Sequence, residues 1–259
     1  MKRNLKIFWL LSIFSAKTAF QHRVGMISFM LGKIIRFVFY FLFIFFLVSR
    51  TKFLAGYSLQ QTIIFFLTFN FIDTMGQLLF REVYRFRPLI VNGELDSVLV
   101  KPYHPFIRIL IGGIDIMDVI TVIPYLGVLV YFIFQAHLNS INILLYTGFM
   151  INALFLATGF HILILAIGII TTEVDNTMWM YRDFTKMLSL PIDIYKEPFR
   201  SFLMFGIPIG IMLAVPVKAL FGLLTTNMYI ISIIISVLFI SFSFFLWNIA
   251  LKKYQSWGG

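Results

Sequence analysis

Residues 143–170 read ILLYTGFMINALFLATGFHILILAIGII, an unbroken run without Asp, Glu, Lys or Arg. An α-helix rises about 1.5 Å per residue, so this run forms a helix of about 40 Å. The hydrocarbon core of a bilayer is about 30 Å thick. The run therefore predicts a membrane-spanning helix.

The rest of the chain has the same apolar character. Of its 259 residues, 60% are hydrophobic and 12% are charged, and the mean hydropathy is +0.94. Soluble domains contain about 45–50% apolar and about 25% charged residues. No linker rich in Gly, Ser or Pro divides the sequence, so we expect residues 1–259 to form a single transmembrane domain. Cysteine is absent, which excludes disulfides and thiolate metal sites.

Hydropathy predicts six spans, near residues 30–48, 59–79, 114–134, 143–170, 202–217 and 229–250. The fifth is the least regular, because Pro208 and Pro216 interrupt it. Lys33 and Arg36 lie near the start of the first span, and their long side chains are expected to reach the membrane interface. The predicted fold is an all-α membrane protein with six transmembrane helices.

Residues 1–23 are basic, and their apolar run is too short to cross a bilayer. They predict an N-terminal interfacial helix with Trp9 at the level of the lipid headgroups. A cleaved signal peptide is the alternative. Lys17 and Arg23, close to the small residues of a possible cleavage site, argue against it.

Lys and Arg are distributed unevenly over the predicted connections. With the N-terminus inside, the outer connections contain only Arg50, Lys52 and Lys218. Positive residues favour the cytoplasmic side, so this asymmetry predicts an N-in, C-in topology. The net charge of +10 gathers at segment ends. Such a pattern indicates contact with anionic membrane lipid and no binding of nucleic acid.

The longest structured polar interval is residues 91–108, VNGELDSVLVKPYHPFIR. The Asn92-Gly93 pair predicts a turn, and the following acidic residues open a helix near residues 95–100. Pro102 and Pro105 end it. The pattern predicts a short cytoplasmic helix lying across the membrane surface, with its apolar side formed by Leu95, Val98 and Leu99. From the residues alone, a polar connector that only packs under the bundle is an equally good interpretation of this segment.

The second cytoplasmic connection, residues 171–200, contains a mixed apolar and charged stretch at residues 176–190. An amphipathic interfacial helix is the favoured interpretation. A tilted, partly inserted span is the alternative, and it would shift the assignment of the fifth span.

Three polar residues share one face of the second span: Asn70, Asp73 and Gln77. A charged side chain in hydrocarbon costs at least about 2.5–3.5 kcal/mol on insertion scales, so this face requires an explanation. Either it lines a transport path, or it joins helices, with Asp73 paired to an arginine near the inner side.

Two acidic residues, Asp115 and Asp118, share a face at the start of the third span. We expect them to form salt bridges there, with Arg81, Arg85 or Arg108 as partners. Binding of a cationic cargo is the alternative.

His161 lies in the middle of the fourth span, without a second ligand at metal-binding spacing. A hydrogen-bonded core histidine is expected, with a proton relay as the alternative. No metal site is predicted.

Three parts of the sequence resemble permease subunits of type-2 ATP-binding cassette (ABC) transporters, in the bacterial branch with a separately encoded ATPase. The first is Gly93-Glu94-Leu95-Asp96-x-x-Leu99-x-Lys101-Pro102, followed by Pro105-Phe106. The others are Pro208…Pro216-x-x-x-Leu220-Phe221-Gly222 and Trp247-x-x-Ala250-Leu251-Lys252-Lys253-Tyr254-x-Ser256. Together with the six spans, the resemblance covers the whole chain.

The resemblance implies that the short helix is a coupling helix, which docks in a cleft of the ATPase subunit. Its docking candidates are Gly93, Glu94, Leu95, Asp96, Leu99, Lys101 and Pro102. It also implies an ATP-driven exporter of the bacterial cytoplasmic (inner) membrane, whose path is formed with a second permease subunit, identical or related. ATP and Mg would bind to the ATPase, because this chain contains no Walker motif, and no cofactor is expected in the chain itself.

Two other classes of function compete with this one. An intramembrane enzyme would need convergent catalytic groups at one depth, and the few candidates, Asp73, Asp115, Asp118 and His161, form no known pair. An ATP-independent channel or carrier more often shows internal repeats, and no convincing repeat is present.

Overall fold

The computed structural model describes residues 2–21 and 23–255. Met1, His22 and Ser256, which belong to the predicted N-terminal helix and to the C-terminal motif, lie outside the described residues, as do residues 257–259. The described residues form helices joined by loops and turns, with an isolated bridge between Leu54 and Tyr57 and no named strand. The prediction of an all-α membrane protein is confirmed.

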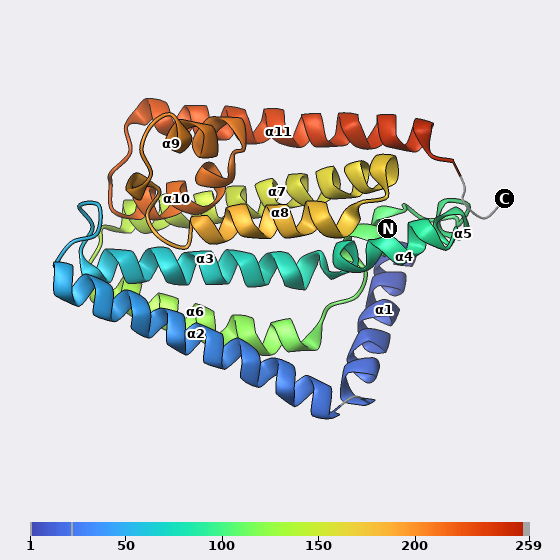
Figure 1. Ribbon diagram of the computed structural model, residues 1–259, viewed down its shortest axis with the longest axis horizontal. Helices are drawn as coiled ribbons and strands as arrows, with labels where there is room; N and C mark the ends of the chain where they lie inside the picture. The colour runs from blue at the N-terminus through green and yellow to red at the C-terminus, as the bar shows by residue number, and fades with distance from the viewer. Residues whose placement is uncertain (1, 22, 256–259) are drawn as a thin grey trace.

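Five long helices are apolar enough to cross a membrane. In Figure 1 they lie roughly along one common axis. They are α2 (Arg23–Thr51), α3 (Leu59–Leu79), α6 (Ile116–Gln135), α7 (Ser140–Thr171) and α11 (Thr226–Lys253). α3 and α7 are mostly buried at the centre, whereas α2, α6 and α11 expose most of their apolar side chains, as helices facing lipid do. These helices confirm the first four predicted spans and the sixth.

The predicted fifth span, residues 202–217, is not one straight helix. It consists of the short α9 (Phe199–Ser201), the π-helical turn η4 (Phe202–Gly206) and α10 (Ile209–Leu220), and the chain bends by 95° between Gly206 and Ile209. Pro208 lies at this bend, where its missing N–H and fixed φ prevent the helix from continuing. α10 is almost completely buried, so it is a core element that no lipid surrounds.

The prediction that residues 176–190 form an interfacial helix is also wrong. α8 (Val174–Met187) runs back along α7, inside the bundle (Figure 1). α7 and α11 run in the same direction, so the chain has to return between them, and α8 begins that return. Its buried residues Val174, Met178 and Tyr181 recur at helical spacing and pack against protein. With 14 residues, α8 is not among the helices long and apolar enough to cross a membrane, so the alternative of a tilted, partly inserted span stays a prediction.

At one end of the bundle, which we call the loop end, α1 (Lys2–Gln21) runs across the direction of the long helices (Figure 1). This position fits the predicted interfacial helix. Gly113 lets α1 come close, since a Cβ there would lie 2.5 Å from the backbone carbon of Leu11. The backbone N–H of Ile114 donates to the hydroxyl of Ser12 at 3.1 Å. α1 is therefore fixed to the connection that leads into α6.

At the opposite end, the far end, one carboxylate joins three separate segments. Asp193 of η3 (Ile192–Ile194) accepts hydrogen bonds from Lys218 Nζ at 2.9 Å and from the hydroxyl of Tyr57 at 2.8 Å. Arg200 Nη1 lies 3.6 Å from it. Burial raises the pKa of Asp193, but these hydrogen bonds and positive charges outweigh burial and hold its pKa below the usual range. The carboxylate is thus ionised when it ties α10 to the loop before α3.

We expect Asp193→Asn to lower the thermal unfolding midpoint at neutral pH, by an amount equivalent to about 1–3 kcal/mol, because Lys218 loses its charged acceptor. A depressed native pKa stabilises the fold above the unfolded value of about 3.9, and this contribution is lost as the pH falls below that value. The difference between the wild type and Asp193→Asn should therefore shrink in acid. Unfolding curves in detergent over the acid range measure this, with Glu94→Gln, an exposed carboxylate at the other end of the bundle, as the control. Equal midpoints for the wild type and Asp193→Asn at neutral pH would contradict the stabilising role.

Candidate functional site

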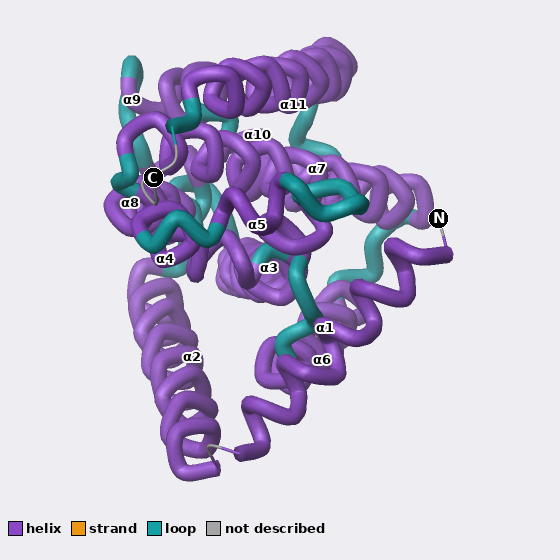
Figure 2. The backbone as a smooth tube through the Cα atoms, turned by 90° about the vertical axis from the view of Figure 1, so that its right-hand side faces the viewer, coloured by secondary structure: helices purple, strands orange, loops and turns teal. Residues whose placement is uncertain are grey.

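The connection between α3 and α6 folds into a cap at the loop end, which faces the viewer in Figure 2. It contains the 3-10 helix η1 (Arg81–Arg85), α4 (Phe86–Val91), α5 (Leu95–Leu99) and the π-helical turn η2 (Ile107–Ile111). Gly93 has a φ of +70°, as the predicted Asn92-Gly93 turn requires. The predicted short helix is present as α5, preceded by Glu94.

α5 separates its side chains into an inner and an outer face. Leu95 and Val98 are buried, and Leu99 packs half-buried against the same core. These three residues confirm the predicted apolar side. The exposed residues around them are Glu94, Ser97, Val100, Lys101 and Pro102.

This arrangement changes the set of docking candidates. Leu95 is fully buried inside its own chain, so it anchors α5 and cannot touch a partner. Val100 is missing from the predicted set, although its side chain is 83% exposed. The sequence holds a signal for it: at about 100° per residue, Val100 falls well away from the stripe formed by Leu95 and Leu99. Val100 is thus an exposed apolar residue on the outer face, next to the polar residues Ser97 and Lys101.

Glu82 in η1 joins the first part of the cap to its last part, η2. Its carboxylate accepts hydrogen bonds from Arg85 Nη1 at 3.4 Å and from Arg108. Gly112 passes directly over it with a φ of +57°, and a Cβ at that position would lie 1.9 Å from the Cγ of Glu82. Both the backbone conformation and the space require glycine at position 112.

Two further contacts connect the cap to distant parts of the chain. The ring of Phe106 lies 4.8 Å from that of Trp247 in α11, so the loop motif and the C-terminal motif pack on each other. Arg3 of α1 donates to the backbone carbonyl of Pro102. The cap is therefore a rigid part of the bundle, since its residues contact helices at both ends of the sequence.

The paired acids at the start of α6 form ion pairs. Arg81 Nε lies 3.3 Å from Asp115 Oδ2, and Arg81 Nη1 lies 3.8 Å from Asp118 Oδ2. Lys33 of α2 pairs with the other oxygen of Asp118. Of the predicted partners Arg81 is correct, while Arg85 and Arg108 bind Glu82 instead. The expectation that Lys33 reaches the interface is wrong, because its buried ammonium is neutralised inside the protein.

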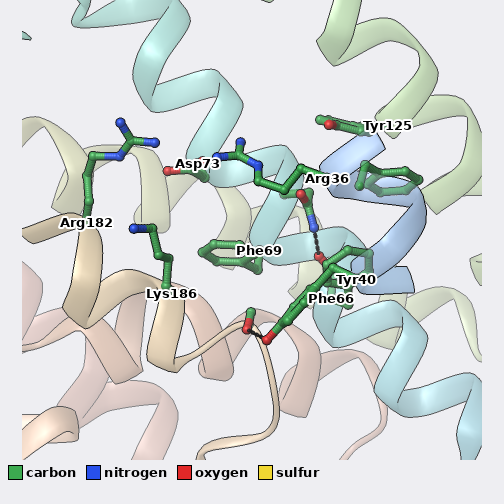
Figure 3. A pocket seen from close by; sticks show the side chains of 11 residues that line it. Arg36, Tyr40, Phe66, Phe69, Asp73, Tyr125, Arg182 and Lys186 are labelled. Atoms are coloured by element: carbon green, nitrogen blue, oxygen red, sulfur yellow. Dashed lines mark hydrogen bonds between the residues drawn. The ribbon is translucent and has the colours of Figure 1, made fainter. Parts of the chain in front are cut away.

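The polar face of α3 lines a cavity of about 280 Å³ between α2, α3, α6 and α8 (Figure 3). Asp73 accepts a hydrogen bond from Gln77 Nε2 at 2.8 Å, and Asn70 Nδ2 donates to its own helix at the carbonyl of Phe66. The expected ion pair of Asp73 with an arginine is not formed within 4.0 Å among the described residues, although Arg182 and Arg36 act on it at longer range. Asn70 and Asp73 therefore line this cavity, and the interpretation that this face lines a transport path stays a prediction.

His161 is a buried core residue, as predicted. Its Nδ1 donates to the carbonyl of Ala157 at 2.7 Å, and its ring packs against Phe80 and Tyr181. Within residues 2–21 and 23–255, no group of three or more His, Asp or Glu side chains is arranged to hold a metal ion.

The fold and the site together define an all-α, multi-pass membrane protein, with a polar cavity between its helices and a cap folded over one end. Residues 34–258 match the family model described as ABC-2 family transporter protein, and the chain belongs to this family. It is a permease subunit, the membrane component of an ABC-2 type transporter rather than the ATPase. Comparison with curated proteins and with solved structures finds no significant match.

Proposed function

We propose that this permease subunit works in an ATP-driven exporter of the bacterial cytoplasmic membrane, with separately encoded ATPase subunits bound at the loop end. The observation that carries the proposal is α5: its inner face is locked into the core, and its outer face presents Glu94, Val100 and Lys101 beyond the ends of the long helices. A short helix displayed in this way suits insertion into a groove of a partner. ATP and Mg would bind to that partner.

The distribution of charge supports an inward-facing loop end. Assigning the return crossing to α8 moves Lys196 and Arg200 to the far end, next to Arg50, Lys52 and Lys218. The loop end still carries the larger share of basic residues: Arg3, Lys6, Lys17, Arg23, Arg81, Arg85, Arg87, Lys101, Arg108, Lys252 and Lys253. Because positive residues favour the cytoplasmic side, this distribution supports the proposed N-in, C-in topology.

The proposed path runs along α3 and α8, where the cavity lies, and is completed by a second permease subunit, identical or related. α2, α6 and α11 expose long apolar surfaces that lipid or a second subunit would cover. Polar residues inside a membrane bundle characteristically mark a transport pathway, and Asp73, Arg36 and Arg182 are such residues.

The natural absence of cysteine provides a direct test. Val100→Cys places a single thiol on the outer face of α5, and Phe53→Cys places one in the exposed far-end loop. In intact cells, a membrane-impermeant maleimide is expected to label Phe53→Cys and to leave Val100→Cys unlabelled until the membrane is opened. A heterobifunctional reagent, with a maleimide for this thiol and a photoreactive group that inserts into neighbouring protein, should then link Val100→Cys to a protein with Walker motifs.

The two readouts test different parts of the proposal. Labelling of Val100→Cys from outside would reverse the orientation. Correct labelling without a link to any ATPase, under conditions in which the complex is intact, would contradict docking at α5.

A further inference from the structure

A cleft rich in cations opens between α2, α3 and α8. It consists of the 280 Å³ cavity and a second hollow of about 570 Å³ on the loop-end side, and both are lined by Arg36, Arg182 and Lys186. We call these joined hollows the basic cleft. Figure 3 shows Arg36 reaching in from α2, and Arg182 and Lys186 from α8, with Asp73 of α3 between them.

Two charged residues of the basic cleft, Asp73 and Arg182, lie well inside the loop end of the helices that carry them. Asp73 lies six residues before the end of α3, and Arg182 lies eight residues after the start of α8. At about 1.5 Å per residue, both lie about 9–12 Å inside the loop end of their helices. Charged groups at such a depth have to be neutralised or hydrated, because hydrocarbon cannot solvate them.

Neighbouring cations of the second hollow have counter-ions, whereas two in the basic cleft do not. Lys33 and Arg81 pair with Asp118, and Arg85 pairs with Glu82. Among the described residues, no carboxylate lies within ion-pair distance of Arg36 or Arg182.

Arg182 shows the missing partner most clearly. Its Nε is buried without a hydrogen-bond partner, although its guanidinium group lies over the rings of Trp179 and Tyr84. Lys186 donates to Asp183 at 3.0 Å on the exposed side of α8, so Asp183 partly neutralises its positive charge. Asp73 is the one carboxylate that lines the cavity, and it already bonds to Gln77. Asp73 lies between Arg36 and Arg182 but acts on them only at longer range than an ion pair. Both guanidinium groups therefore keep donors with which they can bind the oxygens of a further anion in the cleft.

The wall beside these cations is aromatic. Phe37 of α2 lies 5.4 Å from Phe66 and 4.8 Å from Tyr125, ring to ring, and Phe69 lines the same cavity. The hydroxyl of Tyr40 lies 2.8 Å from Ser189 Oγ and joins α2 to the turn that follows α8. A charged group next to such a wall suits a molecule with an anionic head and an apolar body.

We propose that the basic cleft binds an anionic amphiphile, a long hydrocarbon carrying a phosphate or carboxylate head. Arg36 and Arg182 bind the head through charge-assisted hydrogen bonds, and Phe37, Phe66 and Phe69 contact the apolar part. The inference rests on the proposed transport function, because it gives the chemical class of the cargo for the same path. Arginine is well suited to this role, since its planar guanidinium group can hold two oxygens of one phosphate.

Binding can be measured on the purified full chain in a neutral maltoside detergent, with radiolabelled hexadecyl phosphate as the probe. Unlabelled hexadecyl phosphate should displace the label, whereas hexadecyltrimethylammonium, hexadecanol and inorganic phosphate should not. Arg36→Gln and Arg182→Gln are each expected to weaken binding about tenfold, because each removes one charged donor. Arg50→Gln, on the same helix but outside the cleft, serves as the matched control and should bind like the wild type.

Every outcome has a defined meaning. Equal displacement by inorganic phosphate would replace the amphiphile with a water-soluble anion and overturn the proposal. Equal displacement by hexadecyltrimethylammonium, or unchanged affinity in both arginine variants, would overturn it too. If the variants do not fold, the competition series on the wild type decides alone. The assay contains no ATPase, so a failed ATPase link with selective binding would count against the proposed function and leave this inference standing.

Discussion

Val100→Glu is expected to abolish ATP-driven transport and the stimulation of the partner ATPase, while the chain remains folded and membrane-inserted. The Val100 side chain is 83% exposed at the end of α5, so a glutamate there disturbs no internal packing. Buried in a docking groove, the new carboxylate would lose its hydration without gaining a partner. A loss of about 2 kcal/mol, the size found at interface hot spots, corresponds to more than tenfold weaker association. Reconstituted vesicles containing both subunits measure transport and ATP hydrolysis together.

Val24→Glu is the matched control for this variant. It makes the same substitution at a side chain that is 80% exposed, on the first turn of α2 and away from α5. We expect it to keep transport and ATPase stimulation. If Val100→Glu behaved like Val24→Glu in both measurements, α5 would not be the docking element.

Leu95→Asp would test how α5 is held in the cap, and it would not test docking. Leu95 is fully buried, so an aspartate there places an unpaired charge in the core that holds α5 in position. Loss of transport in this variant would report a collapsed cap. The outer residues Glu94 and Val100 test docking, and Leu95 tests how the cap is held.

Long apolar runs and local turn chemistry made much of this fold predictable. Residues 59–79 form α3 with the predicted bounds. Ser58 is the N-cap of this helix, and it forms a capping box with Gln61 in the first turn. The Asn92-Gly93 turn and the apolar side of α5 also follow from local sequence. In these places, the residues that determine the structure lie within a few positions of one another.

The errors arise where distant parts of the chain supply the environment. Arg182 and Lys186 make α8 look like a surface helix, but they face a cavity whose other walls come from α2 and α3. Hydropathy assigns every charged residue to water, and it has no means of detecting a protein-lined cleft. The counter-ion of Lys33 is likewise 85 residues away, at Asp118. Sequence reasoning assigned polar residues to the right face of α3 and missed the cations opposite them.

α2 depends on this long-range pair more than the other helices do. Most of its side chains are exposed, and among its few buried residues are Lys33, Ile44 and Val48. Lys33 reaches Asp118, which is fully buried on α6, and Phe37 stacks on Phe66 of α3 one turn further along. The ion pair therefore fixes the wall of the basic cleft that carries Arg36.

Lys33→Met is expected to destabilise the chain by about 3–5 kcal/mol, because it leaves the carboxylate of Asp118 buried with Arg81 alone, which also binds Asp115. The double variant Lys33→Met/Asp118→Leu should regain most of this loss, since replacing both members of a buried ion pair by apolar residues is often close to neutral. Unfolding in a denaturing detergent measures the stability of the wild type, the single variant and the double variant. Lys17→Met, on the exposed side of α1, controls for the loss of one positive charge. A double variant that is less stable than Lys33→Met would show that Asp118 is held by contacts other than Lys33. Recovery in the double variant would instead establish that charge pairing, and no requirement for lysine itself, fixes α2 against the bundle.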